Sequence, residues 1–245
     1  MTQLSQDNGR RRLAAAAMAG VAVYVLIDVV LQFLPPHYSV VRDAESNLAV
    51  GTFGWIMNLN FLGRALTTLC AIAAIHRVSP NSGLRRTGVF LMAAGGLCSA
   101  VLAFFPTDVG AGHGLVAATP AGTVHLYVAA AGFLAALAGI LALTRWTRSS
   151  PELSRVYPLA FTFAAIAAVG LATLGLSAAT GQDLQGLTER VCLAGVLGWV
   201  LVVCRAIRRL PRRGGPDAPA AAAISGRESL SAATAIEDDR GPSGS

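Results

Sequence analysis

Six long apolar stretches run through this chain, and short polar loops separate them. The core of a lipid bilayer is roughly 30 Å thick and takes about 20 helical residues to cross. Because each stretch reaches or approaches that length, the pattern predicts an all-α, polytopic membrane protein with a bundle of six transmembrane helices. The expected spans are Leu13–Leu34, Phe53–Ile75, Thr87–Phe105, Pro120–Leu143, Pro158–Ala179 and Glu189–Ile207.

The basic residues are distributed unevenly over the loops. All 19 are arginines, and fourteen lie at the N-terminus, in the second and fourth loops or just after the sixth stretch. The first, third and fifth loops with their borders hold only Arg42 and Arg190. Because cytoplasmic loops carry the excess of basic residues, we expect both termini in the cytoplasm and the protein in the cell membrane. The lack of lysine and the abundance of alanine indicate a bacterial source.

Composition divides the chain into three parts. Residues 1–12 are expected to be a cytoplasmic N-terminus, and residues 13–210 carry the six-helix transmembrane domain. From Pro211 the composition shifts to Ala, Gly, Pro and Ser with scattered charges. Such a segment cannot bury enough apolar surface to offset the entropy of ordering it, so residues 211–245 are expected to form a disordered cytoplasmic tail. The short loops leave no room for a soluble catalytic domain.

The charge of the chain does not indicate nucleic acid as a partner. The residues are 54% hydrophobic and 13% charged, with a net charge of +6. The arginines lie at the ends of apolar helices, where they face anionic lipid headgroups. Membrane lipids are therefore the expected partners, and association with further copies of the chain stays open. The four cysteines lie inside the spans without paired spacing or neighbouring histidines, so we expect neither a metal nor another cofactor.

Polar side chains gather at the helix ends opposite the arginine-rich side. Several project from helices rather than loop tips, so they reach a similar depth if the hairpins pack together. The simpler interpretation is that solvated loops are polar without any function. The candidate binding residues are Asn58, Asn60, Asp108, His125, Glu189 and Arg190.

Two charges stand out because they lie deep inside the predicted spans. Asp28 shares a face of the first helix with Tyr24 and Gln32, and Arg64 lies near the middle of the second. An unpaired charge at the bilayer centre costs at least about 2.5–3.5 kcal/mol. Both side chains should therefore point into the bundle, where we expect Asp28 and Arg64 to form an ion pair. The pair is either structural or part of a ligand site.

Short motifs spread over the apolar stretches resemble those of the prokaryotic six-helix membrane proteins grouped as domain-of-unknown-function family 998. The resemblance covers residues 13–207 and implies a six-helix fold but no known activity. It also implies that Ser46, Asp108, His125, Glu189 and Arg190 occupy motif positions. The motifs are Tyr38-Ser39, Glu45-Ser46-Asn47-Leu48, Trp55, Asn58, Phe61, Gly63, Phe105-Pro106-Thr107-Asp108, His125, Gly186 and Glu189-Arg190.

The leading functional hypothesis is an uncharacterised membrane protein with a polar pocket at its outer face. We expect this pocket to bind a ligand rather than to catalyse a reaction. Acid, base and amide groups at headgroup depth suit a lipid headgroup or a small solute, and an arginine fork suits phosphate.

Two alternatives belong to other classes. The first is an intramembrane lipid or amide hydrolase, which could use Ser46, Asp108 and His125 as a catalytic triad. Such a hydrolase could instead use a zinc ion, and the only histidines on the outer side that could bind it are His37, His113 and His125. A small-solute transporter is the third hypothesis, although the chain lacks paired interrupted helices in two halves.

Overall fold

The computed structural model describes residues 3–35, 38–109 and 117–211. Over this part of the chain it contains six α-helices, two short 3₁₀ helices and no strands, which confirms the predicted all-α fold. The α-helices are α1 (Gln3–Leu31), α2 (Gly54–His76), α3 (Gly83–Leu102), α4 (Pro120–Ser149), α5 (Tyr157–Thr180) and α6 (Gln185–Arg209). The 3₁₀ helices are η1 (Glu45–Ala49) and η2 (Ser154–Val156).

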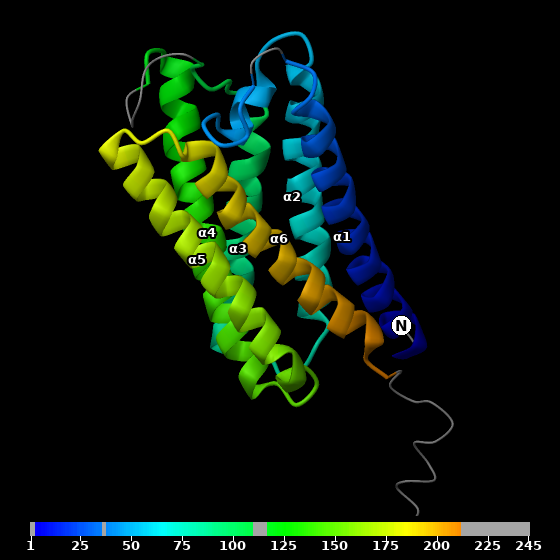
Figure 1. The fold of residues 1–245 in the computed structure, drawn as a ribbon. Helices are drawn as coiled ribbons and strands as arrows, with labels where there is room; N and C mark the ends of the chain where they lie inside the picture. Colours follow the sequence, from blue (N-terminus) through cyan, green and yellow to red (C-terminus); the bar gives the residue numbers. More distant parts are fainter. Residues whose placement is uncertain (1–2, 36–37, 110–116, 212–245) are drawn as a thin grey trace, which may run out of the picture. The chain divides into compact units, whose positions relative to one another are not determined.

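The chain separates into two units, Gly9–Leu210 and Met1–Asn8 with residues 211–245, and the fold described here is that of the first. The predicted tail lies outside the described residues from position 212 onwards, as do His37 and His113. In the first unit the helices run up and down, with the α1–α2, α3–α4 and α5–α6 connections at the end drawn uppermost in Figure 1. We call this the upper end.

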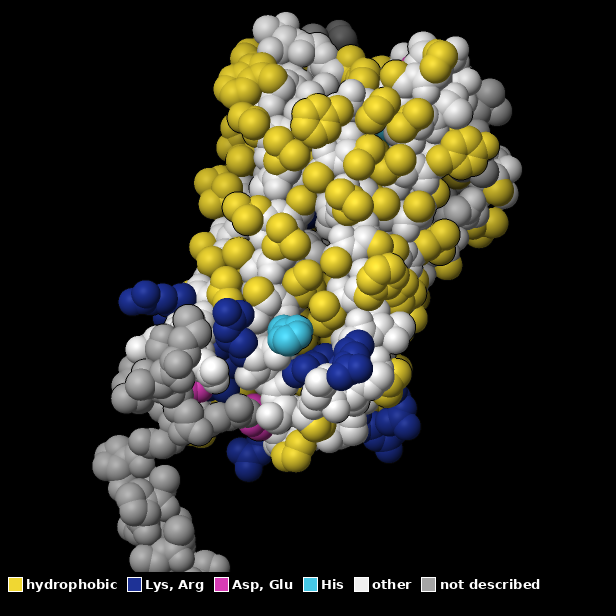
Figure 2. Space-filling model, turned by 180° about the vertical axis from the view of Figure 1, so that it is seen from behind, with side chains coloured by type: hydrophobic (Ala, Val, Ile, Leu, Met, Phe, Trp, Pro, Cys, Tyr) yellow, Lys and Arg dark blue, Asp and Glu magenta, His cyan; other side chains and the backbone are white. Residues whose placement is uncertain are grey.

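Five of the helices are long and apolar enough to cross a membrane. The exception is α3, which has only 20 residues and carries Arg85 and Arg86 in its first turn. It packs against α2 and α4, so the third predicted span is a helix of the same bundle. Figure 2 shows apolar side chains over most of one face and arginines near its lower end. A multi-pass membrane protein presents this kind of surface.

Local sequence explains several helix ends. The Thr119 hydroxyl accepts a hydrogen bond from the amide of Gly122 at 3.0 Å, and Pro120 opens α4 where its missing N–H costs nothing. Ser82 caps α3 in the same way through the amide of Arg85. Gly181 ends α5 in the left-handed region, at φ 68°.

Small residues bring the helices close together. A Cβ atom on Gly170 of α5 would overlap the backbone of Cys192 in α6, and one on Gly20 of α1 would overlap the Thr67 hydroxyl of α2. Close backbone approach at small residues is a common source of packing energy between membrane helices. These contacts bring α5 close to α6 and α1 close to α2.

Candidate ligand-binding site

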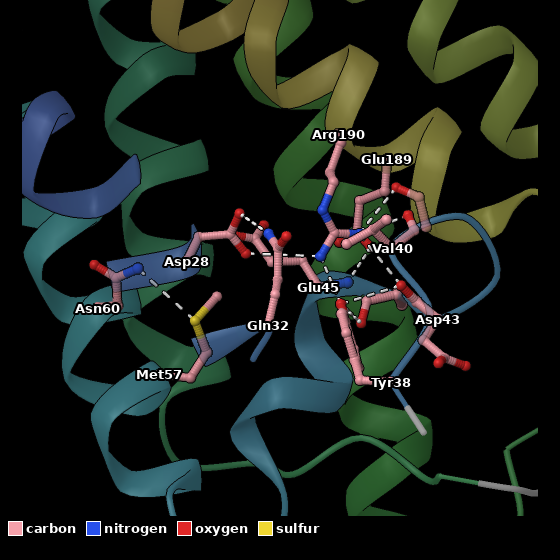
Figure 3. Close-up of polar contacts among 12 residues, drawn as sticks. Asp28, Gln32, Tyr38, Val40, Asp43, Glu45, Met57, Asn60, Glu189 and Arg190 are labelled. Atoms are coloured by element: carbon pink, nitrogen blue, oxygen red, sulfur yellow. Dashed lines mark hydrogen bonds and ion pairs between the residues drawn. The ribbon is translucent and has the colours of Figure 1, made fainter. Parts of the chain in front are cut away.

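A cluster of buried and half-buried charged residues occupies the upper end of the bundle, where the α1–α2 connection folds onto the start of α6 (Figure 3). The backbone makes this junction: the amide of Leu187 donates to the carbonyl of Val41 at 3.0 Å. Gly186 permits the approach, because a Cβ there would overlap the carbonyl of Asp43. The charged cluster comprises Asp28 of α1, Glu45 of η1, and Glu189 and Arg190 of α6.

Arg190 holds the α1–α2 connection in place. Its guanidinium donates to the carbonyls of Val40 and Asp43 at 3.2 and 3.3 Å, and to the Tyr38 hydroxyl at 2.5 Å. It also lies over the Tyr38 ring and 3.7 Å from a carboxylate oxygen of Asp28. Most of its donors are therefore satisfied within the protein, so Arg190 fixes the shape of the site rather than offering a free cation.

Glu45 and Glu189 lie deepest in the charged cluster. The Glu189 carboxylate accepts a hydrogen bond from the amide of Glu45 at 2.8 Å, and the two residues are 9% and 2% exposed. Burial, together with the negative charges of Asp28 and Glu189, raises the pKa of Glu45 to about 8. The Glu45 carboxyl is therefore protonated more readily than an exposed glutamate, whereas Glu189 has a backbone donor.

A second polar layer lies beneath the charged cluster and is centred on Arg64. Its guanidinium donates to the hydroxyls of Ser99 at 2.8 Å and Tyr24 at 3.2 Å. It lies 5.5 and 5.4 Å from the ring centroids of Tyr24 and Phe61, within the range of cation–π attraction. Asn60 steadies this layer, because its amide donates to the Tyr24 carbonyl at 3.1 Å.

This arrangement contradicts the ion pair between Asp28 and Arg64 that the sequence predicted. Asp28 faces Arg190 instead, and Arg64 contacts Tyr24, which lies one turn below Asp28 on the same face of α1. Tyr24 takes the guanidinium because its hydroxyl reaches the level of Arg64. The Asp28 carboxylate is oriented upward by Gln32, whose side-chain amide donates to it at 2.6 Å.

An apolar cavity of about 60 Å³ lies next to Arg64 and Ser99. Four helices line it, and Arg64 is the only charged lining residue in the part of the chain that the structure describes. The cavity is partly open rather than fully enclosed. The other lining residues are Thr67, Thr68, Met92, Gly95, Gly96, Cys98, Leu102, Ala129, Gly132, Phe133, Ala136, Leu193, Val196, Leu197 and Val200.

Asp108 and His125 form a different feature at the start of α4. Asp108 accepts hydrogen bonds from the Thr119 hydroxyl at 2.7 Å and from the amides of Thr119 and Ala118 at 2.9 and 2.7 Å. These hydrogen bonds lower the pKa of Asp108, and the bond from the Thr119 hydroxyl has the largest effect. Asp108 thus tethers the helix start, as expected for an anion at the positive end of a helix.

His125 is buried and its Nδ1 lies 2.6 Å from the Phe105 carbonyl. A catalytic triad would need a carboxylate at this nitrogen, and a backbone oxygen occupies that place. The half-buried Ser46 and Asn58 lie on η1 and α2, respectively. No group of three or more His, Cys, Asp or Glu side chains within the described ranges could hold a metal ion.

Four residues of the site were absent from the predicted set: Tyr24, Tyr38, Glu45 and Ser99. Tyr24 carried a sequence signal, since it shares the face of Asp28, and Glu45 lies in a motif of the first loop. Ser99 had no signal beyond its being a hydroxyl in an apolar helix. Burial of the Glu45 loop by α6 is a tertiary property that no local pattern contains.

Apolar helices of this length, arranged around buried polar side chains, define a multi-pass membrane protein. The chain belongs to the family described as "Protein of unknown function (DUF998)", whose model matches residues 18–206. This range includes every residue of the charged cluster and the layer around Arg64. No curated protein and no solved structure matches the chain.

Proposed function

We propose that this protein binds a membrane lipid that carries an anionic group, with that group at Arg64 and part of its hydrocarbon in the adjoining cavity. The observation that carries the proposal is the position of Arg64 and Ser99 at an otherwise apolar cavity. Ligand sites typically combine apolar walls with a few placed polar groups. A lipid has the matching division between a charged and an apolar part.

The surroundings of Arg64 favour an anion over a neutral or cationic group. The hydrogen-bonding partners of its guanidinium are neutral hydroxyls, those of Ser99 and Tyr24. Its charge is thus not cancelled by a carboxylate in direct contact, unlike that of Arg190 beside Asp28. A planar guanidinium is well suited to carboxylate or phosphate oxygens. The cavity volume suits a short stretch of hydrocarbon, so the rest of the lipid chain lies in the bilayer.

The proposed location is the cell membrane, with both termini in the cytoplasm and the upper end of the bundle outside. The arginine distribution along the chain supports this orientation. The site then lies in the half of the membrane away from the cytoplasm. Lipids of that leaflet would reach the cavity between the helices.

Lipid retention by the purified protein tests the proposal. We expect mass spectrometry of extracted protein to find about one bound anionic lipid per chain, as for a single site. Ala129→Leu fills part of the cavity and should reduce the retained lipid, and Arg64→Gln should reduce it and weaken the preference for anionic lipid. Ala130→Leu, at the adjacent exposed position, is the matched control and should retain lipid as the parent does. Equal lipid content in the two leucine variants would contradict the proposal.

A further inference from the structure

Two buried carboxyl oxygens of the charged cluster have no hydrogen-bond donor among the described residues. They are Oδ1 of Asp28 and Oε2 of Glu45. Gln32 occupies the other Asp28 oxygen, and Arg190 lies 3.7 Å from Oδ1, beyond hydrogen-bonding distance. Leaving a buried acceptor without a donor costs about 1–3 kcal/mol, so two unsatisfied carboxyls in one cluster indicate a missing hydrogen.

The charges around these oxygens do not balance if every group is ionised. Carboxyl groups come from α1, η1 and α6, and guanidinium groups come from α2 and α6. The hydroxyls of Tyr24 and Tyr38 are the neutral titratable neighbours. Ionisation of all the acids would leave one uncompensated negative charge in a buried region, which is strongly unfavourable. The facing groups are Asp28, Glu45, Glu189, Arg64 and Arg190.

We infer that Asp28 and Glu45 bind a single proton between their side chains, with Glu45 carrying it and donating to the Asp28 carboxylate. This one hydrogen supplies a donor to Asp28 and removes the excess negative charge. Figure 3 shows the two side chains meeting from α1 and η1 beneath Arg190. The proton comes from solvent and returns to it, so no bond other than O–H forms or breaks.

Tyr24 connects this protonation site to Arg64. Its hydroxyl interacts with Glu45 and also accepts a hydrogen bond from Arg64. Loss of the proton would place a carboxylate charge near Arg64 and oppose any anion there. The inference itself does not depend on lipid binding, because the proton is required by the buried oxygens alone.

The direction of the pH effect follows from the environment of Glu45. Burial, the charge of Asp28 and the charge of Glu189 raise its pKa to about 8, against the opposing effect of Arg64 and of the Tyr24 hydrogen bond. The folded state therefore binds the proton more tightly than the unfolded chain does. The resulting stability is fully present below the ordinary glutamate pKa and is lost as the pH rises through about 8.

Infrared titration of the intact protein in detergent tests the site directly. The wild type should show the carbonyl band of a protonated carboxyl group at pH 6 and lose it towards pH 9. Glu45→Gln should lack this band, and its unfolding temperature should change less over the same range. The wild-type unfolding temperature should fall by at least about 2–4 °C more than that of the variant.

Two further variants keep the test decisive. Asp28→Asn removes the acceptor charge, so the Glu45 band should persist but titrate at lower pH, even if Glu45→Gln fails to fold. Asp108→Asn, at the separate α4 site, should leave band and pH profile unchanged. Persistence of the band in folded Glu45→Gln, its loss only in Glu189→Gln, or an unshifted titration in Asp28→Asn would overturn the assignment.

Discussion

Arg64 and Arg190 are half-buried arginines of the same bundle, and their partners give them different roles. Arg190 binds carbonyls and the Tyr38 hydroxyl and lies beside Asp28, which ties the first connection to α6. Arg64 binds two side-chain hydroxyls at the edge of a cavity. The sequence placed Arg64 on an inward face and Arg190 among the polar residues at the helix ends, but it did not distinguish a structural arginine from one available to a ligand.

The pairing of Asp28 can be measured by double-mutant cycles. Asp28→Asn and Arg190→Gln should be coupled by about 0.5–3 kcal/mol in the free energy of unfolding. Either change alone leaves the other, mostly buried charge without its counter-charge. Asp28→Asn and Arg64→Gln should show a smaller coupling, since these side chains communicate only through Tyr24 and Glu45. Titration with a denaturing detergent provides the measurement. A larger coupling for Asp28 with Arg64 would mean that the ion pair predicted from sequence is the real one.

Among the elements, α5 and α6 pack against each other through glycines and alanines. Gly170 and Gly195 face the backbone of the opposite helix, where a Cβ would overlap Cys192 or Ala167. The start of α6 supplies Glu189 and Arg190, so the α5–α6 contact also determines the position of the charged cluster. Small residues in an apolar stretch are typical of closely packed membrane helices, but they do not indicate which helix is the partner.

A pair of glycine substitutions on α5 tests this interface. Gly170→Ala should lower the free energy of unfolding by about 1–3 kcal/mol, because the added methyl group forces the helices apart. Gly175→Ala should be neutral or should stabilise the helix by up to about 1 kcal/mol, since no atom lies within 4 Å of its Cβ position. Thermal unfolding in detergent compares the two. Equal effects would show that α5 does not approach α6 this closely.

The whole molecule combines an apolar exterior, arginines at the lower end and a polar interior at the upper end. The fold class and the family are confirmed, whereas the orientation in the membrane stays a prediction. Labelling with a membrane-impermeant thiol reagent can decide it in intact cells. Gln182→Cys, at the exposed upper end of the bundle, should react, and Gly83→Cys, at the first residue of α3, should not. The parent chain with its four native cysteines is the control, and reaction at position 83 would reverse the orientation.

The sequence by itself determined the membrane class, the approximate spans, the family and the clustering of arginines on alternate loops. These properties follow from local composition and from the length needed to cross a bilayer. It also singled out Asp28, Asn60, Arg64, Glu189 and Arg190 as candidates, since polar groups in apolar helices are conspicuous, and the structure places them in the charged cluster and in the layer around Arg64. Local patterns are sufficient for such features because each depends on residues close together in the chain.

Only the tertiary structure decided how these residues combine. Asp28 meets Arg190, and the amide of Glu45 meets Glu189, because the α1–α2 connection folds onto α6. The burial that keeps a proton on Glu45, and the cavity beside Arg64, arise where several helices pack together. Desolvation and cavity shape depend on residues far apart in the chain. Periodicity along one helix therefore cannot specify them.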